Sequence, residues 1–418
     1  MSLPKINLVV VGHKDHGKST LIGRLLYDSK AIMAQKLAEI RTELEQSGKE
    51  FEFAYLMDSL EEERRGGLTI DIMHTPFKSE KYEYTIIDCP GHKEFIEKML
   101  TGASEADAAV LVVSAKEGIG DQTRQHAFLI KTLGIKQLVV AINKLDRLDY
   151  QEKYYVETCK QLTQILQELG YSNINMIPIS AIKGDNVFTK SKNMPWYTGP
   201  TLIETLDQKI IPNTLPVNKP LRGVVQDNYP YENNQMITAS KIETGTIKVG
   251  KKIIFNPSKK TSTVKKILAL GSEAAKAGPG DSVGLILEDN TVIERGEVLS
   301  YPENQPEKVE SFVAEVILFS HIKIRKGDII TIRIGTAEKK CKVEKILTEI
   351  DSINLTIVSN NPEMLERESA VGELKIIPLE PLSVEKYSEF PELGRFVIEG
   401  KKGTAGAGII LEINSQKG

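Results

Sequence analysis

The sequence predicts an α/β domain with a parallel sheet, followed by two small antiparallel β-barrels. In the first half of the chain, short apolar runs typical of strands alternate with segments of helical periodicity. In the second half, the pattern changes to short segments in which apolar and polar residues alternate, separated by turn residues. This pattern is typical of antiparallel barrels. The length of 418 residues also exceeds what one core usually supports, so two or three domains are expected.

The first domain is predicted from its apolar runs. They occupy residues 8–11, 84–87, 109–113, 138–142 and 176–179. Helical patterns such as residues 122–133 separate them, which favours a parallel α/β sheet. A segment with three prolines, residues 211–220, then reads as a linker. We therefore place the first domain at residues 1–212.

The two barrels are predicted from turn-separated strands. Residues 241–250 and 278–287 show the pattern in the first barrel. A second proline-bearing break at residues 301–306 divides the region. Strand patterns resume at residues 309–319, 329–334 and 396–399. The predicted domains are therefore residues 213–304 and 305–418.

Composition narrows the class of protein. The 40% hydrophobic and 27% charged content is ordinary for a soluble globular chain. A net charge of -3 argues against a dedicated nucleic-acid binder, although it does not exclude a local basic face. With no signal-peptide stretch and no run of eighteen apolar residues, we expect a cytoplasmic protein without a membrane partner. The three scattered cysteines indicate reduced thiols.

A phosphate-binding loop is predicted at residues 12–19, which read G-H-K-D-H-G-K-S directly after an apolar run. The two glycines let backbone N–H groups turn inward, and Lys18 reaches the outer phosphates. Ser19 offers a hydroxyl to Mg²⁺. The helical pattern that follows adds the partial positive charge of a helix N-terminus. The predicted nucleotide contacts are Gly12, His13, Lys14, Asp15, His16, Gly17, Lys18, Ser19 and Thr20.

A second group of residues is predicted at the outer phosphates and the metal. Asp88 ends an apolar strand and suits the second shell of Mg²⁺, and Gly91 can present its N–H to a γ-phosphate. Cys89 and Pro90 complete this loop. Thr69 is a candidate second hydroxyl ligand, the alternative being a threonine in a β-hairpin. His92 could orient the attacking water, although a loop histidine is more often inert.

The base is predicted from residues 143–146, which read N-K-L-D after a strand. Asp146 can accept hydrogen bonds from N1–H and the 2-amino group of guanine, whereas adenine would leave the carboxylate unpaired. GTP is therefore favoured over ATP. Asn143 would brace the loops and the Lys144 stem would cover the base. The guanine oxygen would be held by a backbone N–H of the segment Ser180, Ala181 and Ile182.

Together the motifs G-H-K-D-H-G-K-S, G-L-T-I-D, D-C-P-G-H, N-K-L-D and S-A resemble the translational GTPase superfamily. The resemblance covers essentially the whole chain. It implies a P-loop G domain followed by two antiparallel β-barrels, with GTP or GDP and Mg²⁺ as cofactors. It also implies that His92 is the catalytic residue that positions the hydrolytic water.

Within the superfamily, the chain looks most like the GTPase large subunit of heterodimeric sulfate adenylyltransferase. Three differences from elongation factors favour this interpretation. Residues 118–124 lack an insertion, and residues 233–243 lack a G-x-G-T-V pattern. Glu399 stands where tRNA carriers show an R-D-x-x-x-T segment, and it would repel an RNA phosphate. The resemblance implies that GTP hydrolysis drives a small catalytic partner subunit, which forms adenosine 5′-phosphosulfate from ATP and sulfate.

The alternative is a translational GTPase similar to elongation factor 1-alpha, which delivers aminoacyl-tRNA to the ribosome or acts in ribosome rescue. Its best support is a basic cluster in the second domain, which a solvated barrel face explains about as well. The cluster comprises Lys251, Lys252, Lys259, Lys260, Lys265 and Lys266. In either class Lys14 is unusual, since relatives generally carry Val there. Its charge could restrain hydrolysis or stabilise the transferring phosphate.

Overall fold

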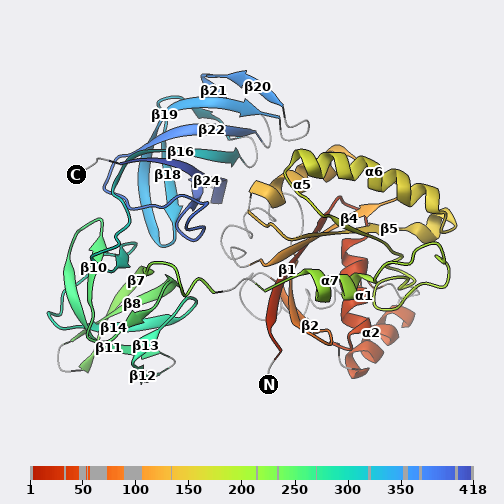
Figure 1. The fold of residues 1–418 in the computed structure, drawn as a ribbon, viewed down its shortest axis with the longest axis horizontal. Helices are drawn as coiled ribbons and strands as arrows, with labels where there is room; N and C mark the ends of the chain where they lie inside the picture. Colours follow the sequence, from red (N-terminus) through yellow and green to blue (C-terminus); the bar gives the residue numbers. More distant parts are fainter. Residues whose placement is uncertain are drawn as a thin grey trace. The chain divides into compact units, whose positions relative to one another are not determined.

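The computed structural model forms two compact units, Met1–Asn213 and Thr214–Gly418 (Figure 1). It describes residues 3–32, 34–46, 53, 55–56, 73–88, 106–132, 134–212, 215–232, 235–269, 271–318, 322–351, 356–366, 370–400 and 403–415. None of the helices in this part of the chain is long and apolar enough to span a bilayer.

The first unit contains a six-stranded sheet, counted over the described residues, with the order β2-β3-β1-β4-β5-β6. The strands are β1 (Lys5–Gly12), β2 (Met73–Lys78), β3 (Glu83–Asp88), β4 (Ala108–Ser114), β5 (Leu138–Asn143) and β6 (Asn175–Pro178). All neighbours run parallel except β2, which is antiparallel to β3. Each predicted apolar run forms one of these strands, so the predicted parallel sheet is confirmed. The antiparallel edge strand β2 was not predicted.

Helices cover both faces of this sheet (Figure 1). They are α1 (Lys18–Asp28), α2 (Ala34–Gln46), α5 (Asp121–Thr132), α6 (Glu152–Glu168) and α7 (Leu202–Lys209). Side chains alternate between the faces of a strand, so Leu8 and Val10 of β1 pack into one core with α1 and α7. Val9 and Val11 are buried but do not belong to that core, as expected for side chains on the opposite face of the strand. The carboxyl ends of the parallel strands are thereby held in one fixed row.

Helix α7 begins with a capping box. The Thr201 hydroxyl accepts from the backbone N–H of Glu204, and the Glu204 carboxylate accepts from the backbone N–H of Thr201 at 2.8 Å. This reciprocal pair satisfies two backbone donors that have no partner inside the helix. It defines where the last helix of the first unit starts.

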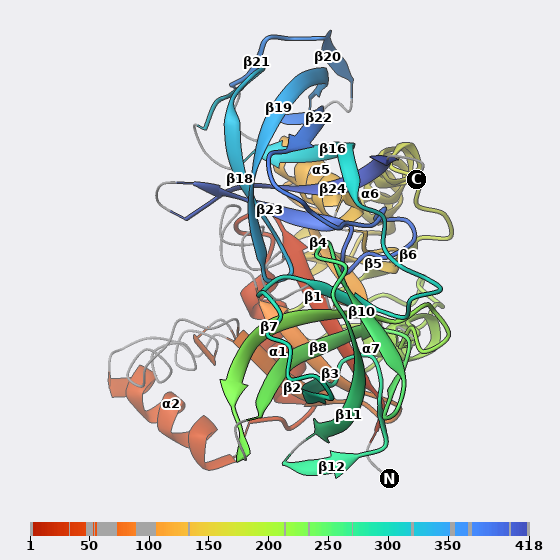
Figure 2. The same cartoon turned by 90° about the vertical axis from the view of Figure 1, so that its left-hand side faces the viewer.

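The first barrel closes from six antiparallel strands of the described chain. They are β7 (Arg222–Pro230), β8 (Met236–Thr244), β10 (Lys252–Asn256), β11 (Thr261–Ala269), β14 (Ser282–Leu287) and β15 (Val298–Ser300). The order β10-β15-β7-β8-β14-β11 returns on itself through the β10–β11 pair. Figure 2 shows β7 beside β8 in this barrel. The short strand β12 (Ser272–Ala274) extends this sheet beside β11, whereas β9 (Ile247–Lys248) and β13 (Lys276–Ala277) pair with each other in a separate two-stranded sheet.

The second barrel repeats this closure with longer strands. Its described members are β16 (Val309–Leu318), β18 (Ile329–Ile334), β19 (Ala337–Ile350), β22 (Val371–Pro378), β23 (Arg395–Gly400) and β24 (Gly403–Ser415). The order β18-β23-β24-β16-β22-β19 closes through the β18–β19 pair. Additional short strands are β17 (Ile324–Arg325), β20 (Ile357–Asn360) and β21 (Met364–Leu365). The predicted pair of antiparallel barrels is confirmed.

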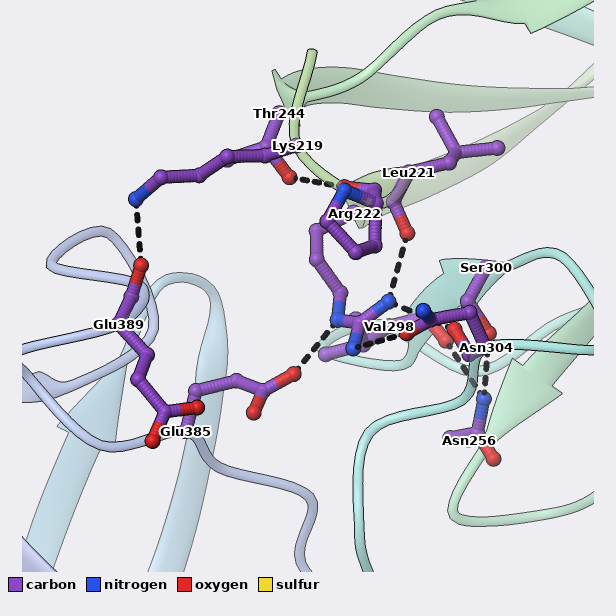
Figure 3. A network of polar contacts seen from close by, with 11 residues as sticks. Lys219, Leu221, Arg222, Thr244, Asn256, Val298, Ser300, Asn304, Glu385 and Glu389 are labelled. Atoms are coloured by element: carbon purple, nitrogen blue, oxygen red, sulfur yellow. Dashed lines mark hydrogen bonds and ion pairs between the residues drawn. The ribbon is translucent and has the colours of Figure 1, made fainter. Parts of the chain in front are cut away.

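A buried ion pair joins the two barrels within the second unit (Figure 3). Arg222 of β7 donates from Nε to Glu385 Oε1 at 2.6 Å, and both residues are less than 10% exposed. The same guanidinium donates to the backbone oxygens of Leu221 and Asn304 and lies 4.8 Å from the ring centroid of Phe390. These contacts satisfy a charge that burial alone would strongly disfavour.

Candidate nucleotide-binding site

The phosphate loop joins the end of β1 to the start of α1. Gly12 has φ 154° and Gly17 has φ 92°. A Cβ on Gly12 would lie 2.3 Å from the Val112 carbonyl oxygen, and one on Gly17 would lie 2.4 Å from Asn143 Nδ2. Both glycines are required by close approach to neighbouring strands as well as by backbone conformation.

The Lys18 ammonium lies across this loop. Its Nζ donates to the backbone carbonyl oxygens of Gly12 at 2.7 Å and His13 at 3.0 Å. Lys18 is also the first residue of α1, whose N-terminus carries a partial positive charge. A cation and a helix N-terminus at one loop provide the electrostatic setting that a phosphate group needs.

The first turn of α1 fits a hydroxyl ligand for Mg²⁺. Ser19 is exposed there, and hydroxyl and carboxylate oxygens suit this hard cation. The last residue of β3, Asp88, is the register partner of Val10 in β1, which brings its backbone beside the strand that leads into the loop. The Asp88 side chain and Thr69 lie outside the described residues.

His16 is a buried neutral residue of the loop. It is 2% exposed, and its Nδ1 donates to the Val112 carbonyl oxygen at 3.3 Å. Burial lowers the pKa of His16 to about 4, so the ring is uncharged at neutral pH. Its ring stacks on that of His13 with centroids 5.0 Å apart. The positive charge of the loop therefore comes from its lysines.

Asn143 connects the phosphate loop to the loop after β6. Its Nδ2 donates to the His16 carbonyl oxygen at 2.9 Å, and its Oδ1 accepts from the Ala181 N–H at 2.9 Å. The sequence assigned this bracing role to Asn143. It also offered Ala181 as a donor to the guanine oxygen, whereas here that N–H is already bonded to Asn143. The reason is the register of β5 and β6, which brings Ala181 beside the Asn143 amide.

Asp146 lies in the short 3-10 helix Leu145–Leu148. Its Oδ1 accepts from the Ser180 hydroxyl at 2.7 Å. This contact orients the carboxylate that the sequence assigns to guanine. From the sequence, Ser180 was expected only as part of a segment whose backbone N–H donates to the guanine oxygen. The structure adds a role for its hydroxyl. Ile182, the last residue of that segment, is 45% exposed.

Lys144 adopts a left-handed conformation with φ 66°. Its Nζ donates to Glu117 Oε1 at 3.0 Å. Glu117 was not predicted, because a single carboxylate in a loop has no sequence signature. The pair fixes the ammonium group of the N-K-L-D loop itself.

Three further contacts that sequence reasoning missed support the base loops. The Tyr150 hydroxyl donates to Asp185 Oδ2 at 2.9 Å, and Trp196 Nε1 donates to the Tyr150 carbonyl oxygen at 2.8 Å. On the other side, a Cβ on Gly184 would lie 2.3 Å from Arg24 Nη2. Arg24 belongs to α1, so the helix after the phosphate loop packs directly on the loop after β6.

Part of the predicted hydrolytic machinery lies outside the described residues. This holds for Cys89, Pro90, Gly91 and His92, as it does for Thr69. Lys14 is exposed in the phosphate loop. Its relation to His92, and the hydrolytic role of His92, therefore stay predictions.

A parallel sheet with this phosphate loop and this N-K-L-D loop, followed by two barrels, defines a GTPase of the translational class. The chain belongs to the elongation factor family of these GTPases. The family described as Elongation factor Tu GTP binding domain matches residues 3–212, and the GTP-eEF1A C-terminal domain-like family matches residues 311–411. The nucleotide cofactor is accordingly GTP or GDP, with Mg²⁺ as the associated ion.

Similar proteins cover the whole chain. Elongation factor 1-alpha of Thermoplasma acidophilum is 42% identical over 99% of this chain and 99% of its own. That of Methanocaldococcus jannaschii is 42% identical over 99% of this chain and 98% of its own. A crystal structure of sup35 complexed with GDP is 26% identical, covers 99% of this chain and 95% of its own, and has a TM-score of 0.45.

The prediction that this chain is a subunit of sulfate adenylyltransferase is wrong. Eight curated relatives, 40 to 42% identical over at least 98% of this chain, are all elongation factor 1-alpha. The prediction depended on loop and surface differences, which vary among proteins that share a scaffold. The structure explains one of these differences, the acidic residue Glu399. Glu399 pairs with Arg333 at 3.0 Å, so its charge is compensated locally. Because the sulfate adenylyltransferase function is not supported, the predicted catalytic adenylyltransferase partner is not supported either.

Proposed function

We propose that this chain is a GTP-dependent translation factor of the elongation factor 1-alpha type, which carries aminoacyl-tRNA to the ribosome. The observation that carries this proposal is the full-length similarity to eight elongation factors 1-alpha. The site supports it, because its loops provide separate contacts for phosphates and for guanine.

The residues divide the work of nucleotide binding. The Lys18 ammonium and the N-terminus of α1 bind the phosphates, while Asp146, oriented by Ser180, accepts from the guanine edge. Asn143 keeps the two loops together. Ser19, Thr69 and Asp88 would hold Mg²⁺, which supplies neutralisation of phosphate charge when bound. His92 would orient the attacking water.

The basic cluster of the first barrel offers a surface for RNA phosphates. Lys251, Lys252 and Lys265 are exposed, and no carboxylate in the described part of the chain pairs with them. Lys266, by contrast, pairs with Glu273. Unpaired cations are the groups that release counterions when a polyanion binds. We therefore assign Lys251, Lys252 and Lys265 to the RNA-facing surface.

Protection of the aminoacyl ester tests the proposal. Aminoacyl-tRNA is incubated with the full chain and GTP, GDP or ATP, and ester hydrolysis is followed over time. We expect slower hydrolysis with GTP only, and an apparent affinity that falls steeply with salt. Equal hydrolysis rates with GTP and GDP would contradict the proposal.

Charge variants sharpen this test. The triple change Lys251→Gln, Lys252→Gln and Lys265→Gln should weaken binding and reduce the magnitude of the salt slope, by about 1 for each phosphate that a lysine no longer neutralises. Lys323→Gln in the second barrel serves as control, since Lys323 already pairs with Glu366 at 2.9 Å. An unchanged slope in the triple variant would remove these lysines from the RNA surface.

A further inference from the structure

Glu117 belongs to a cluster of charged and polar groups beside the nucleotide site. Its Oε1 lies 3.0 Å from Lys144 Nζ. Lys144 comes from the N-K-L-D loop, and His16, whose pKa responds to the charges of both residues, comes from the phosphate loop. Glu117 itself follows β4. The carboxylate therefore joins the loop after β4 to the loop after β5, and its charge acts on a ring of the loop after β1.

The backbone holds Glu117 in place. Its N–H donates to the Ser114 hydroxyl at 3.3 Å, and the N–H of Gly118 donates to the Ser114 carbonyl oxygen at 2.9 Å. The N–H of Ala115 donates to the Asn143 carbonyl oxygen at 2.9 Å. The turn that carries Glu117 is thus anchored to the end of β5, where the N-K-L-D loop begins.

Lys144 gains a defined side-chain position from this carboxylate. A lysine side chain has many rotamers, and its ordering is entropically unfavourable. Here the side chain of Lys144 is 18% exposed and that of Glu117 is 41% exposed. The ion pair fixes the ammonium end, and the left-handed backbone of Lys144 fixes the other end. The stem between them is therefore held at both ends.

The charges around Glu117 favour an ion pair with Lys144 rather than with His16. Burial alone would raise the pKa of the Glu117 carboxyl, but the hydrogen bond and charge of Lys144 outweigh it and the pKa is lowered. His16 is neutral at pH 7, because its own pKa is lowered by burial. Lys144 is therefore the cation that Glu117 binds.

We propose that Glu117 is a positioning residue for the guanine nucleotide, acting through Lys144. The inference rests on the proposed function and on the prediction from the sequence that the Lys144 stem covers the base. Because the base is common to both nucleotides, Glu117 contributes equally to the affinities for GTP and GDP. A residue acting at the γ-phosphate would instead discriminate between them.

Nucleotide affinity tests this role in the full chain. Dissociation constants for fluorescent GTP and GDP analogues are measured for wild type, Glu117→Gln, Lys144→Met and the double variant. We expect Glu117→Gln to weaken both nucleotides by roughly two- to fivefold, the range that a half-exposed ion pair provides. In the Lys144→Met background, Glu117→Gln should have no further effect, because its partner is absent.

A matched control is Glu366→Gln, which removes another exposed ion pair, to Lys323 at 2.9 Å, in the second barrel. Its nucleotide affinity should equal that of wild type. The inference is overturned if Glu117→Gln binds as tightly as wild type, if the two substitutions are additive, or if GTP alone is affected. In each of these outcomes wild type still binds guanine nucleotides, so only the role of Glu117 fails. If wild type binds no guanine nucleotide, the proposed function itself fails.

Discussion

The side-chain amide of Asn143 donates to the backbone carbonyl oxygen of His16 at 2.9 Å, so the N-K-L-D loop is bonded directly to the phosphate loop. The same amide accepts from Ala181. Asn143 is 3% exposed, and a buried hydrogen bond of this kind has no water to replace it when one partner is removed.

Asn143→Asp should therefore loosen the nucleotide site. A carboxylate keeps the acceptor for Ala181 but cannot donate to His16. We expect GDP to dissociate about tenfold faster, from a loss of about 1.4 kcal/mol, in a stopped-flow chase with unlabelled nucleotide. Asn175→Asp, the same change at the opposite end of the sheet in β6, is the control. Identical release rates for Asn143→Asp and wild type would disprove the bracing role.

Asp146→Asn should change the preferred base. An amide in place of the carboxylate can donate to the 2-oxygen of xanthine, but it loses the charge-assisted acceptor for guanine. We expect GDP affinity to fall at least about tenfold and XDP to bind in preference, as measured by competition. Asp149→Asn is the control, since it lies three residues further on at φ 50°, a conformation that asparagine accepts. Unchanged GDP affinity in Asp146→Asn would refute the base assignment.

Gly17→Ala should abolish nucleotide binding. Its Cβ would lie 2.4 Å from Asn143 Nδ2, so the phosphate loop and the Asn143 amide would have to separate. Gly170→Ala separates this clash from backbone strain, because Gly170 has φ 85° and nothing within 4 Å of a Cβ. Both variants should lose thermal stability, and only Gly17→Ala should lose GDP in calorimetric titration. Retained binding in Gly17→Ala would show that the loop can move away from Asn143.

The first unit should become less stable in acid because of His16. An unperturbed histidine titrates near 6.5, whereas burial lowers the pKa of His16 to about 4. As pH falls from 6.5 toward 4, the unfolded chain binds a proton that the folded chain does not, so the stability present at neutral pH is lost. The free energy of unfolding should fall by at most about 1.4 kcal/mol per pH unit from this group.

Trp196, the one tryptophan of the chain, lies in the first unit, so its fluorescence follows that transition during urea unfolding. The decrease in stability from near pH 7 to near pH 5 should be smaller in His16→Asn than in wild type. Equal decreases in the two proteins would assign the acid sensitivity to other groups.

Arg222→Met should destabilise the second unit (Figure 3). It leaves Glu385 buried without its cation, and breaking a buried pair in this way costs about 3–5 kcal/mol. Arg222→Met with Glu385→Leu should recover part of that loss, because no charge remains buried. Lys323→Met, which breaks an exposed pair, should change stability by less than about 1 kcal/mol. Circular dichroism during urea unfolding measures all three. A loss in Arg222→Met no larger than in Lys323→Met would contradict the burial argument.

The positions of most strands along the chain and the types of its domains could be predicted from local patterns. Apolar runs such as 8–11 and 138–142 became β1 and β5, because buried parallel strands must be continuously apolar. The antiparallel strand β2 was missed, because Met73–Lys78 contains a proline and little alternation. The particular member of the GTPase class was also mispredicted, since it depended on loop segments that the fold does not constrain.

The sequence by itself determined the loop type, the base and the class of protein. Those follow from residues close together in the chain, such as the two glycines around His16 and the aspartate of the N-K-L-D loop. Only the tertiary structure decided that Glu117 holds Lys144, that Ser180 orients Asp146 and that the partner of the Asn143 amide is the His16 carbonyl oxygen. These partners lie 27, 34 and 127 residues apart, and strand order and register alone bring them together. No local pattern records such distances, because a single carboxylate or hydroxyl gains its role only from what the fold places beside it.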